Sequence, residues 1–214
     1  MEAQYILSSI YYEGKDVKQN IKKAIQYWTM AANNNHVYSQ HNLGLIYIQG
    51  EFVPRDISKA KKYFLLAAYQ GNSDSQFALG LIYIDPNFSN VDVNKAIHYF
   101  SLAANLNHSL AQYYLGFFYY NGKLIPRDIN KSINYLLLSA NQFNSDAQLF
   151  IGNIYYEGKY VKRDINKAIY YFNLAAIQND STAQYNLGVL YINQDIEKAI
   201  HYFTLSANQK NCNA

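Results

Sequence analysis

One dipeptide recurs along this chain at an unbroken interval of 36 residues. Ala-Gln or Ser-Gln begins at positions 3, 39, 75, 111, 147 and 183, and Lys followed by Ala or Ser begins at positions 23, 59, 95, 131, 167 and 198. A period of this length is typical of solenoid proteins, in which each repeat is one supersecondary unit that buries its apolar face against its neighbours. We therefore expect a single array of six repeats, at residues 1–35, 36–71, 72–107, 108–143, 144–179 and 180–211, followed by a tail at 212–214.

The spacing of apolar residues within each repeat predicts two helices. In the second repeat, the second helix carries Ala60, Tyr63, Phe64, Ala67 and Ala68, an apolar stripe with offsets of 0, 3, 4, 7 and 8. The first helix of each repeat has small or apolar residues with a similar helical spacing, and no segment of comparable length alternates as a strand does. The expected fold is all-α, with about twelve antiparallel helices.

We call the residues at one position in successive repeats a column. Two columns have a structural explanation. Each predicted second helix is preceded by a residue whose side-chain oxygen accepts a hydrogen bond from the backbone at a helix start. These N-caps are Asn20, Asp56, Asp92, Asp128, Asp164 and Asp195. We expect Ser73, Ser109, Ser145 and Ser181 to cap the first helices of four repeats in the same way.

Nine of the ten glycines also fall into two columns. Those that follow the first helix are expected to adopt the left-handed conformation that ends a helix: Gly14, Gly50, Gly122 and Gly158. The others lie inside the first helix, where glycine costs about 1 kcal/mol relative to alanine: Gly44, Gly80, Gly116, Gly152 and Gly188. A second helix that crosses too closely for a side chain would explain the interior column, and Gly116→Leu should then destabilise the array.

Written as a pattern, one unit is Ala-Gln-x-x-Leu-Gly-x-x-Tyr-x-x-Gly, a short loop, and Asp-x-x-Lys-Ala-x-x-Tyr-Phe-x-x-Ala-Ala. The fifth repeat carries it as Ala147, Gln148, Ile151, Gly152, Tyr155, Gly158, Asp164, Lys167, Ala168, Tyr171, Phe172, Ala175 and Ala176. This pattern resembles the Sel-one-like repeat (SLR), a relative of the tetratricopeptide repeat. The resemblance implies helix pairs stacked into a right-handed superhelix, and a scaffold or adaptor that holds other proteins together without chemistry of its own.

In stacks that resemble the tetratricopeptide repeat, the first helix of each pair lines a concave groove. We number positions within a repeat from residues 1, 37, 73, 109, 145 and 181. The groove-facing residue at position 5 is aromatic in four of six repeats, which suits binding of a peptide or helix. This column holds Tyr5, His41, Phe77, Tyr113, Leu149 and Tyr185. Further candidates at positions 9 and 12 are Leu45, Leu81, Phe117, Tyr120 and Tyr156, and position 12 fits the core between repeats equally well.

Two alternative functions are also consistent with the sequence. Basic residues in successive inter-helix loops could form one edge that binds an acidic partner or nucleic acid: Lys18, Arg55, Arg127, Lys162 and Arg163. The array could also be the repeat module of a larger assembly, such as a kinase-associated one or one of the endoplasmic-reticulum degradation type. The ends of the array could in addition pair with another copy.

Composition narrows the classes of function. Half of the residues are hydrophobic and the net charge is only +3, which excludes a disordered chain and disfavours a dedicated nucleic-acid binder. The histidines and the lone Cys212 show no metal-ligand spacing, and the glycines do not cluster as a phosphate-binding loop. We therefore expect no cofactor, no metal and no enzymatic activity. With one cysteine, no apolar run of about 20 residues and no signal-like start, the expected location is the cytoplasm.

Overall fold

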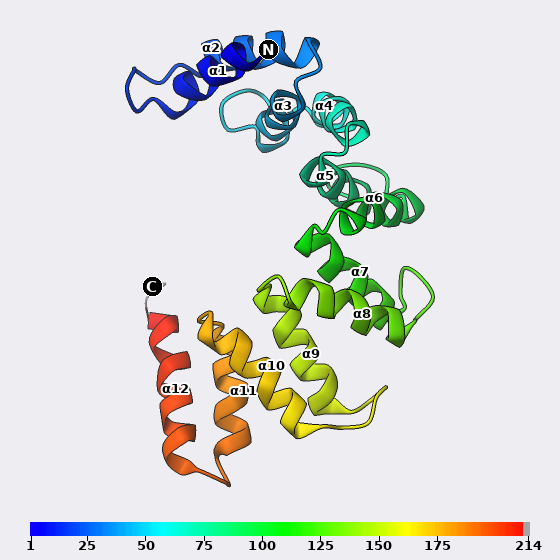
Figure 1. Ribbon diagram of the computed structural model, residues 1–214, viewed down its shortest axis with the longest axis vertical. Coiled ribbons are helices and arrows are strands. Elements are labelled where there is room, and N and C mark those ends of the chain that lie inside the picture. The colour runs from blue at the N-terminus through cyan, green and yellow to red at the C-terminus, as the bar shows by residue number, and fades with distance from the viewer. Residues whose placement is uncertain (212–214) are drawn as a thin grey trace. The chain divides into compact units, whose positions relative to one another are not determined.

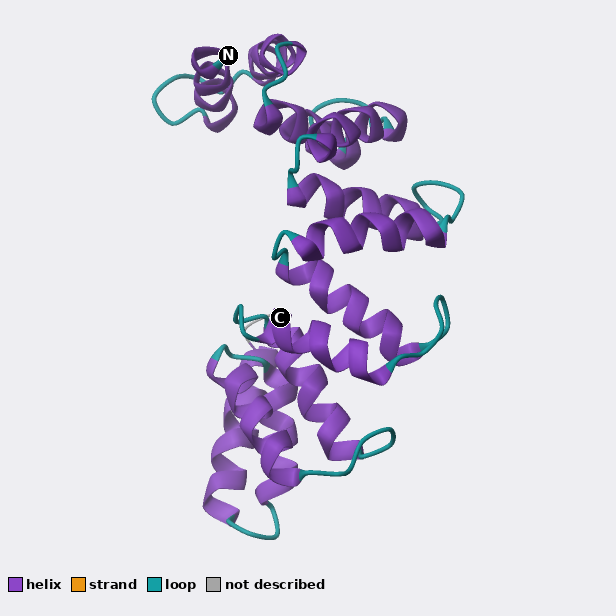
Figure 2. Ribbon diagram, turned by 45° about the vertical axis from the view of Figure 1, so that its right-hand side comes forward, coloured by secondary structure: helices purple, strands orange, loops and turns teal. Residues whose placement is uncertain are grey.

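The chain folds into helix pairs joined by short loops (Figure 1). The structure, a computed structural model, describes the backbone of residues 1–211 and the side chains of residues 1–209. Over these residues it has twelve α-helices. Figure 2 shows helices and loops and no strand among them, so the predicted all-α fold is confirmed. Cys212 and the predicted tail, 212–214, lie outside the described residues.

The helices divide between two compact units, each with three helix pairs. Unit 1, Met1–His108, contains α1 (Glu2–Glu13), α2 (Ile21–Asn33), α3 (Val37–Gln49), α4 (Ile57–Tyr69), α5 (Ser73–Ile84) and α6 (Val93–Asn105). Unit 2, which begins at Ser109, contains α7 (Ser109–Asn121), α8 (Ile129–Ala140), α9 (Ser145–Glu157), α10 (Ile165–Ile177), α11 (Ser181–Tyr191) and α12 (Ile196–Asn211). Odd-numbered helices are the first helices of the repeats, and even-numbered helices are the second.

The hydrophobic core is divided into clusters that join neighbouring repeats. In unit 1, Ala24 and Trp28 of α2 pack with Leu43 and Ile46 of α3. The same combination of a second helix with the next first helix recurs between α4 and α5, α8 and α9, and α10 and α11. Each repeat therefore depends on its neighbour for half of a core cluster, as the solenoid pattern predicts.

The interior glycines lie where the two helices of one repeat cross. A Cβ atom built on Gly44 would lie 2.5 Å from the Phe64 ring of α4. Gly80, Gly152 and Gly188 face a phenylalanine in the same way, and Gly116 faces Leu136, at 2.5–2.7 Å. The close crossing predicted from the sequence is confirmed. In the first repeat Ser8 stands in this column and is buried, as is Trp28 at the phenylalanine position of the pair.

The second-helix caps are also confirmed. Asp56 accepts a hydrogen bond from the Lys59 backbone amide at 2.9 Å, and the other five predicted caps do the same at 3.0–3.1 Å. The prediction for the first-helix serines is wrong by one residue. Asn72, Asn144 and Asp180 are the caps of α5, α9 and α11, and the serines are the first residues of the helices.

Stacked tyrosines account for much of the tyrosine content. In the second repeat the rings of Tyr47 and Tyr63 lie 5.9 Å apart and almost parallel, and the Lys59 ammonium lies 5.1 Å from the centre of the Tyr47 ring. A similar stack occurs in every repeat, with ring centres 5.7–6.3 Å apart and planes within 9° of each other. The recurring Lys and Tyr columns therefore brace the two helices of a repeat from outside the core.

Candidate functional site

The column at unit position 5 packs against the second helices and also reaches the surface. In unit 1 the His41 ring lies 5.7 Å from Phe64, and Phe77 lies 5.7 Å from Phe100 and 4.6 Å from His108. His41 and Phe77 are half-buried against these rings, so packing is one reason for aromatic residues in this column. Burial lowers the pKa of His41, which keeps its imidazole neutral at physiological pH, and its Nδ1 lies 2.8 Å from Ser75 Oγ.

In unit 2 this column differs in exposure from repeat to repeat. Tyr113 and Leu149 are half-buried, whereas the Tyr185 side chain is 55% exposed although its ring lies 5.7 Å from Phe203. Tyr185 also lines a pocket of about 240 Å³ with Tyr156 of α9. The two predicted residues Tyr156 and Tyr185 thus come together at one site between α9 and α11.

Aromatic side chains form a continuous cluster across α7, α9 and the loop after α9. Phe150 is at its centre, with its ring 5.8 Å from Phe117 and 5.2 Å from Tyr120. Tyr113 lies 6.4 Å from Phe117, and Tyr160 lies 5.4 Å from Tyr120. Phe117 is 38% exposed and the other four rings are half-buried, so the cluster is partly open to solvent. We call these five residues the α7–α9 aromatic cluster.

The hydroxyl groups of Tyr113 and Tyr120 stay protonated over the physiological pH range. Burial raises the pKa of Tyr113, and the nearby Asp146 carboxylate raises it further. Burial likewise raises the pKa of Tyr120, with a smaller contribution from Glu157, whose Oε2 lies 3.5 Å from the tyrosine hydroxyl. The cluster therefore combines apolar ring area with neutral hydrogen-bond donors, a combination that favours protein recognition.

Two members of the cluster were not predicted from the sequence. Phe150 is at unit position 6, one residue after the column that was expected to face a partner, and Tyr160 is in the inter-helix loop. Position 6 is aromatic in two repeats only, at Tyr114 and Phe150, so no periodic signal identified it.

Unit 1 has its own pocket beside the first helices. It has a volume of about 230 Å³ and is lined by Tyr5, Ser9, Tyr12, Trp28 and Leu45, among others. The Nε1 atom of Trp28 is buried without a hydrogen-bond partner. Leu81 of α5, the remaining candidate of this unit, is half-buried.

The predicted basic edge is engaged in contacts within the chain. Arg127 Nε donates to the Tyr120 carbonyl at 2.9 Å, and its guanidinium lies 4.6 Å from the centre of the Tyr160 ring. Arg163 Nε donates to the Tyr156 carbonyl at 3.0 Å. These bonds satisfy carbonyls at helix C-termini, which otherwise lack partners. Arg55 lies over the Phe88 ring at 4.6 Å. All five residues of the basic edge, including Lys18 and Lys162, are exposed.

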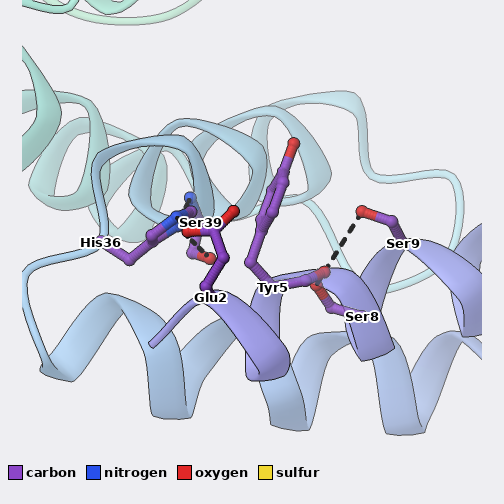
Figure 3. Close-up of polar contacts among 6 residues, drawn as sticks. All are labelled: Glu2, Tyr5, Ser8, Ser9, His36 and Ser39. Carbon is purple, nitrogen blue, oxygen red and sulfur yellow. Dashed lines mark hydrogen bonds and ion pairs between the residues drawn. The ribbon is translucent and has the colours of Figure 1, made fainter.

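One group of side chains has the composition of a hydrolase triad. His36 Nε2 lies 3.5 Å from Glu2 Oε2, and His36 Nδ1 lies 2.9 Å from Ser39 Oγ, as Figure 3 shows at the starts of α1 and α3. However, Ser39 is fully buried, and His36 Nδ1 also accepts the Ser39 backbone amide at 3.2 Å as the N-cap of α3. A nucleophile must reach its substrate, so this group is an N-cap and not a catalytic site.

Among residues 1–211, no three His, Cys, Asp or Glu side chains gather as a metal site would require. In the same residues no helix combines the length and the apolar character needed to cross a bilayer.

Comparison with known proteins identifies the repeat. The Sel1 repeat matches six times, at residues 2–36, 37–72, 73–108, 109–142, 145–180 and 181–211. A protective antigen of uropathogenic Escherichia coli with an SLR fold is similar over 97% of this chain, with 29% identity and a TM-score of 0.89; the match covers 46% of that protein, so this chain spans about half its length. No curated protein matches the sequence significantly.

Two further solved structures are similar. A Sel1 repeat protein from Oxalobacter formigenes matches over 97% of this chain and 87% of its own, with 28% identity and a TM-score of 0.85. An immunity protein of Pseudomonas aeruginosa matches 97% of this chain and 81% of its own, with 18% identity and a TM-score of 0.57, and shares the fold. Sel1 repeat proteins commonly mediate protein–protein interactions and are generally non-enzymatic scaffolds. The six in-phase matches show that this chain belongs to the Sel1 repeat family.

Proposed function

We propose that this protein is a non-enzymatic scaffold that binds a peptide or helix of a partner protein on the α7–α9 aromatic cluster. The proposal rests on the partial exposure of this cluster, in which Phe117 is the most exposed ring. Aromatic side chains supply a large contact area with few rotatable bonds, so they lose little entropy when a partner orders them.

The surroundings of the cluster favour an apolar segment with polar ends. Glu157 lies beside Tyr120, and Arg127 lies over Tyr160, so charged groups border the rings. An apolar centre with a polar rim is the usual anatomy of a protein interface. Tyr185 and the pocket that it shares with Tyr156 would extend the same contact to α11.

Phe117→Ala tests the proposal. Proteins that co-purify with the wild-type chain from the cells that express it are identified, and their affinities are then measured with purified components. We expect Phe117→Ala to weaken binding at least about tenfold, because truncation of a central aromatic anchor costs more than about 1.4 kcal/mol.

Leu138→Ala is the matched control, because Leu138 lies on the second helix α8 and is 48% exposed. A partner that binds Phe117→Ala as tightly as wild type would contradict the proposal. Binding that weakens steeply with salt and is lost on Arg55→Ala with Arg163→Ala would instead assign recognition to the basic edge.

A further inference from the structure

The first helix, α1, exposes a face that its counterparts bury. In α3 the residues of this face, Ser39, Leu43 and Ile46, are at most 3% exposed. Their counterparts in α1 are Ala3, which is exposed, Leu7, which is 37% exposed, and Ile10, which is 39% exposed. The same three positions are at most 2% exposed in α5 and α9: Ser75, Leu79 and Ile82, and Ala147, Ile151 and Ile154. No helix of unit 1 covers this face of α1.

The last helix, α12, exposes the opposite half of the same contact. Ala207 is exposed, whereas its counterparts Ala32, Ala68, Ala140 and Ala176 are 2–8% exposed. Ile200 is 59% exposed, whereas its counterparts in α2 and α10, Ile25 and Ile169, are half-buried. The face of α12 that would meet a following first helix is therefore open within the described residues.

The two open faces are complementary because they are the two halves of one recurring core cluster. Between α10 and α11, that cluster joins Ala168, Phe172 and Ala176 to Ala183 and Leu187. The α12 residues at the first three positions are Ala199, Phe203 and Ala207, and the α1 residues at the last two are Ala3 and Leu7. Ala199 and Phe203 already pack within their own repeat, but Phe203, Ala207, Ala3 and Leu7 keep exposed surface that their counterparts bury at the internal junctions.

A hydrogen bond also recurs at these junctions. Gln184 Nε2 of α11 donates to the Ala176 carbonyl of α10 at 3.2 Å, and Gln40 donates to the Ala32 carbonyl at 3.1 Å. The counterpart in α1 is Gln4, whose side chain has no such carbonyl to bond, and whose Oε1 is buried without a partner. The Ala207 carbonyl of α12 is the counterpart of the acceptors.

We propose that α1 of one copy docks on α12 of a second copy, so that the chain associates head to tail (helix labels in Figure 1). The occupant is a second copy because α12 carries the same side chains, at the same spacing, as the second helices that cover the counterparts of α1. The two faces differ, so the contact is heterologous.

Two arginine substitutions test the proposal. Ala3→Arg blocks the α1 face and Ala207→Arg blocks the α12 face; both positions are exposed, so the fold should tolerate the change. Ser58→Arg, at an exposed position on α4, is the control with the same charge change. Circular dichroism checks that each variant is folded. Sedimentation velocity then measures the mass from about 10 µM to 1 mM, a range that covers the Kd of weak, transient contacts.

We expect the mass of the wild type and of Ser58→Arg to rise with concentration, and each blocked variant to remain monomeric. An equal mixture of Ala3→Arg and Ala207→Arg has one working face of each kind, so it should form dimers and nothing larger. A wild type that stays monomeric over the whole range would overturn the proposal. So would association of either blocked variant alone, which would show that like faces pair, or a mixture that does not form dimers.

Discussion

At the scale of single residues, the buried glutamine of the repeated dipeptide joins three helices. Gln148 of α9 donates from Nε2 to the Ala140 carbonyl of α8 at 3.1 Å and accepts at Oε1 from Gln178, after α10, at 2.8 Å. A buried amide without hydrogen-bond partners is costly, so this pair of hydrogen bonds explains why glutamine recurs every 36 residues. In the third repeat the second of these hydrogen bonds is missing. Leu106 stands at the position of the donor glutamine, and Gln76 Oε1 is buried without a partner.

Leu106→Gln should therefore stabilise the protein. The new side chain can donate to Gln76 Oε1 as Gln178 donates to Gln148, and a hydrogen bond of this kind contributes about 1 kcal/mol. Leu106 is 51% exposed, so little apolar burial is lost. The measurement is the free energy of unfolding in urea.

Leu106→Asn provides the control for this substitution. Asn34 occupies the same column in the first repeat, where its amide donates to the Met30 carbonyl and leaves Gln4 Oε1 unpaired. The shorter amide should therefore give no gain. Equal stabilisation by both substitutions would show that the gain comes from removal of an exposed leucine.

At the scale of the helix pair, a glycine and an aromatic ring set how closely the two helices approach. Alanine in place of a helical glycine normally stabilises by about 1 kcal/mol. At Gly152 a Cβ would lie 2.5 Å from the Phe172 ring, so we expect Gly152→Ala to destabilise by about 1–3 kcal/mol through overpacking. In a Phe172→Ala background the ring is gone, and the same substitution should become neutral or stabilising. Urea unfolding of the four proteins in this cycle gives the coupling, and an equal cost in both backgrounds would contradict the steric explanation.

Some features of the helix pair could be predicted from the sequence, and others could not. The stripes, the Asp56-type caps and the interior glycines were predictable because each repeats and has a local physical cause. The caps of α5 and α9 were misplaced by one residue because Asn72 and Ser73 are both good capping residues, and only the backbone decides between them. The α7–α9 aromatic cluster was predictable only in part. Tyr113, Phe117 and Tyr120 were candidates from their positions in the repeat, whereas Phe150 and Tyr160 belong to no aromatic column and join the cluster only through packing between repeats.

At the scale of the whole molecule, stability depends on contacts between neighbours. Each core cluster joins a second helix to the next first helix, so an interior first helix such as α5 packs both on α4 of the preceding repeat and on α6 of its own. In contrast, α1 and α12 each leave one face uncovered within the described residues. Leu7, for example, is 37% exposed, whereas Leu79 of α5 is fully buried.

This difference predicts a gradient in hydrogen exchange within each unit. Amides of α1 should exchange faster than those of α5, and amides of α12 faster than those of α10, by about ten- to a hundredfold. The missing half-cluster corresponds to about 1–3 kcal/mol of apolar burial, and each 1.4 kcal/mol is a factor of about ten in the opening equilibrium. The experiment is native-state exchange followed by mass spectrometry, at a protein concentration low enough to keep the chain monomeric. Equal protection of α1 and α5 would mean that unit 1 opens as one cooperative body, and would contradict a stability that sums over neighbouring repeats.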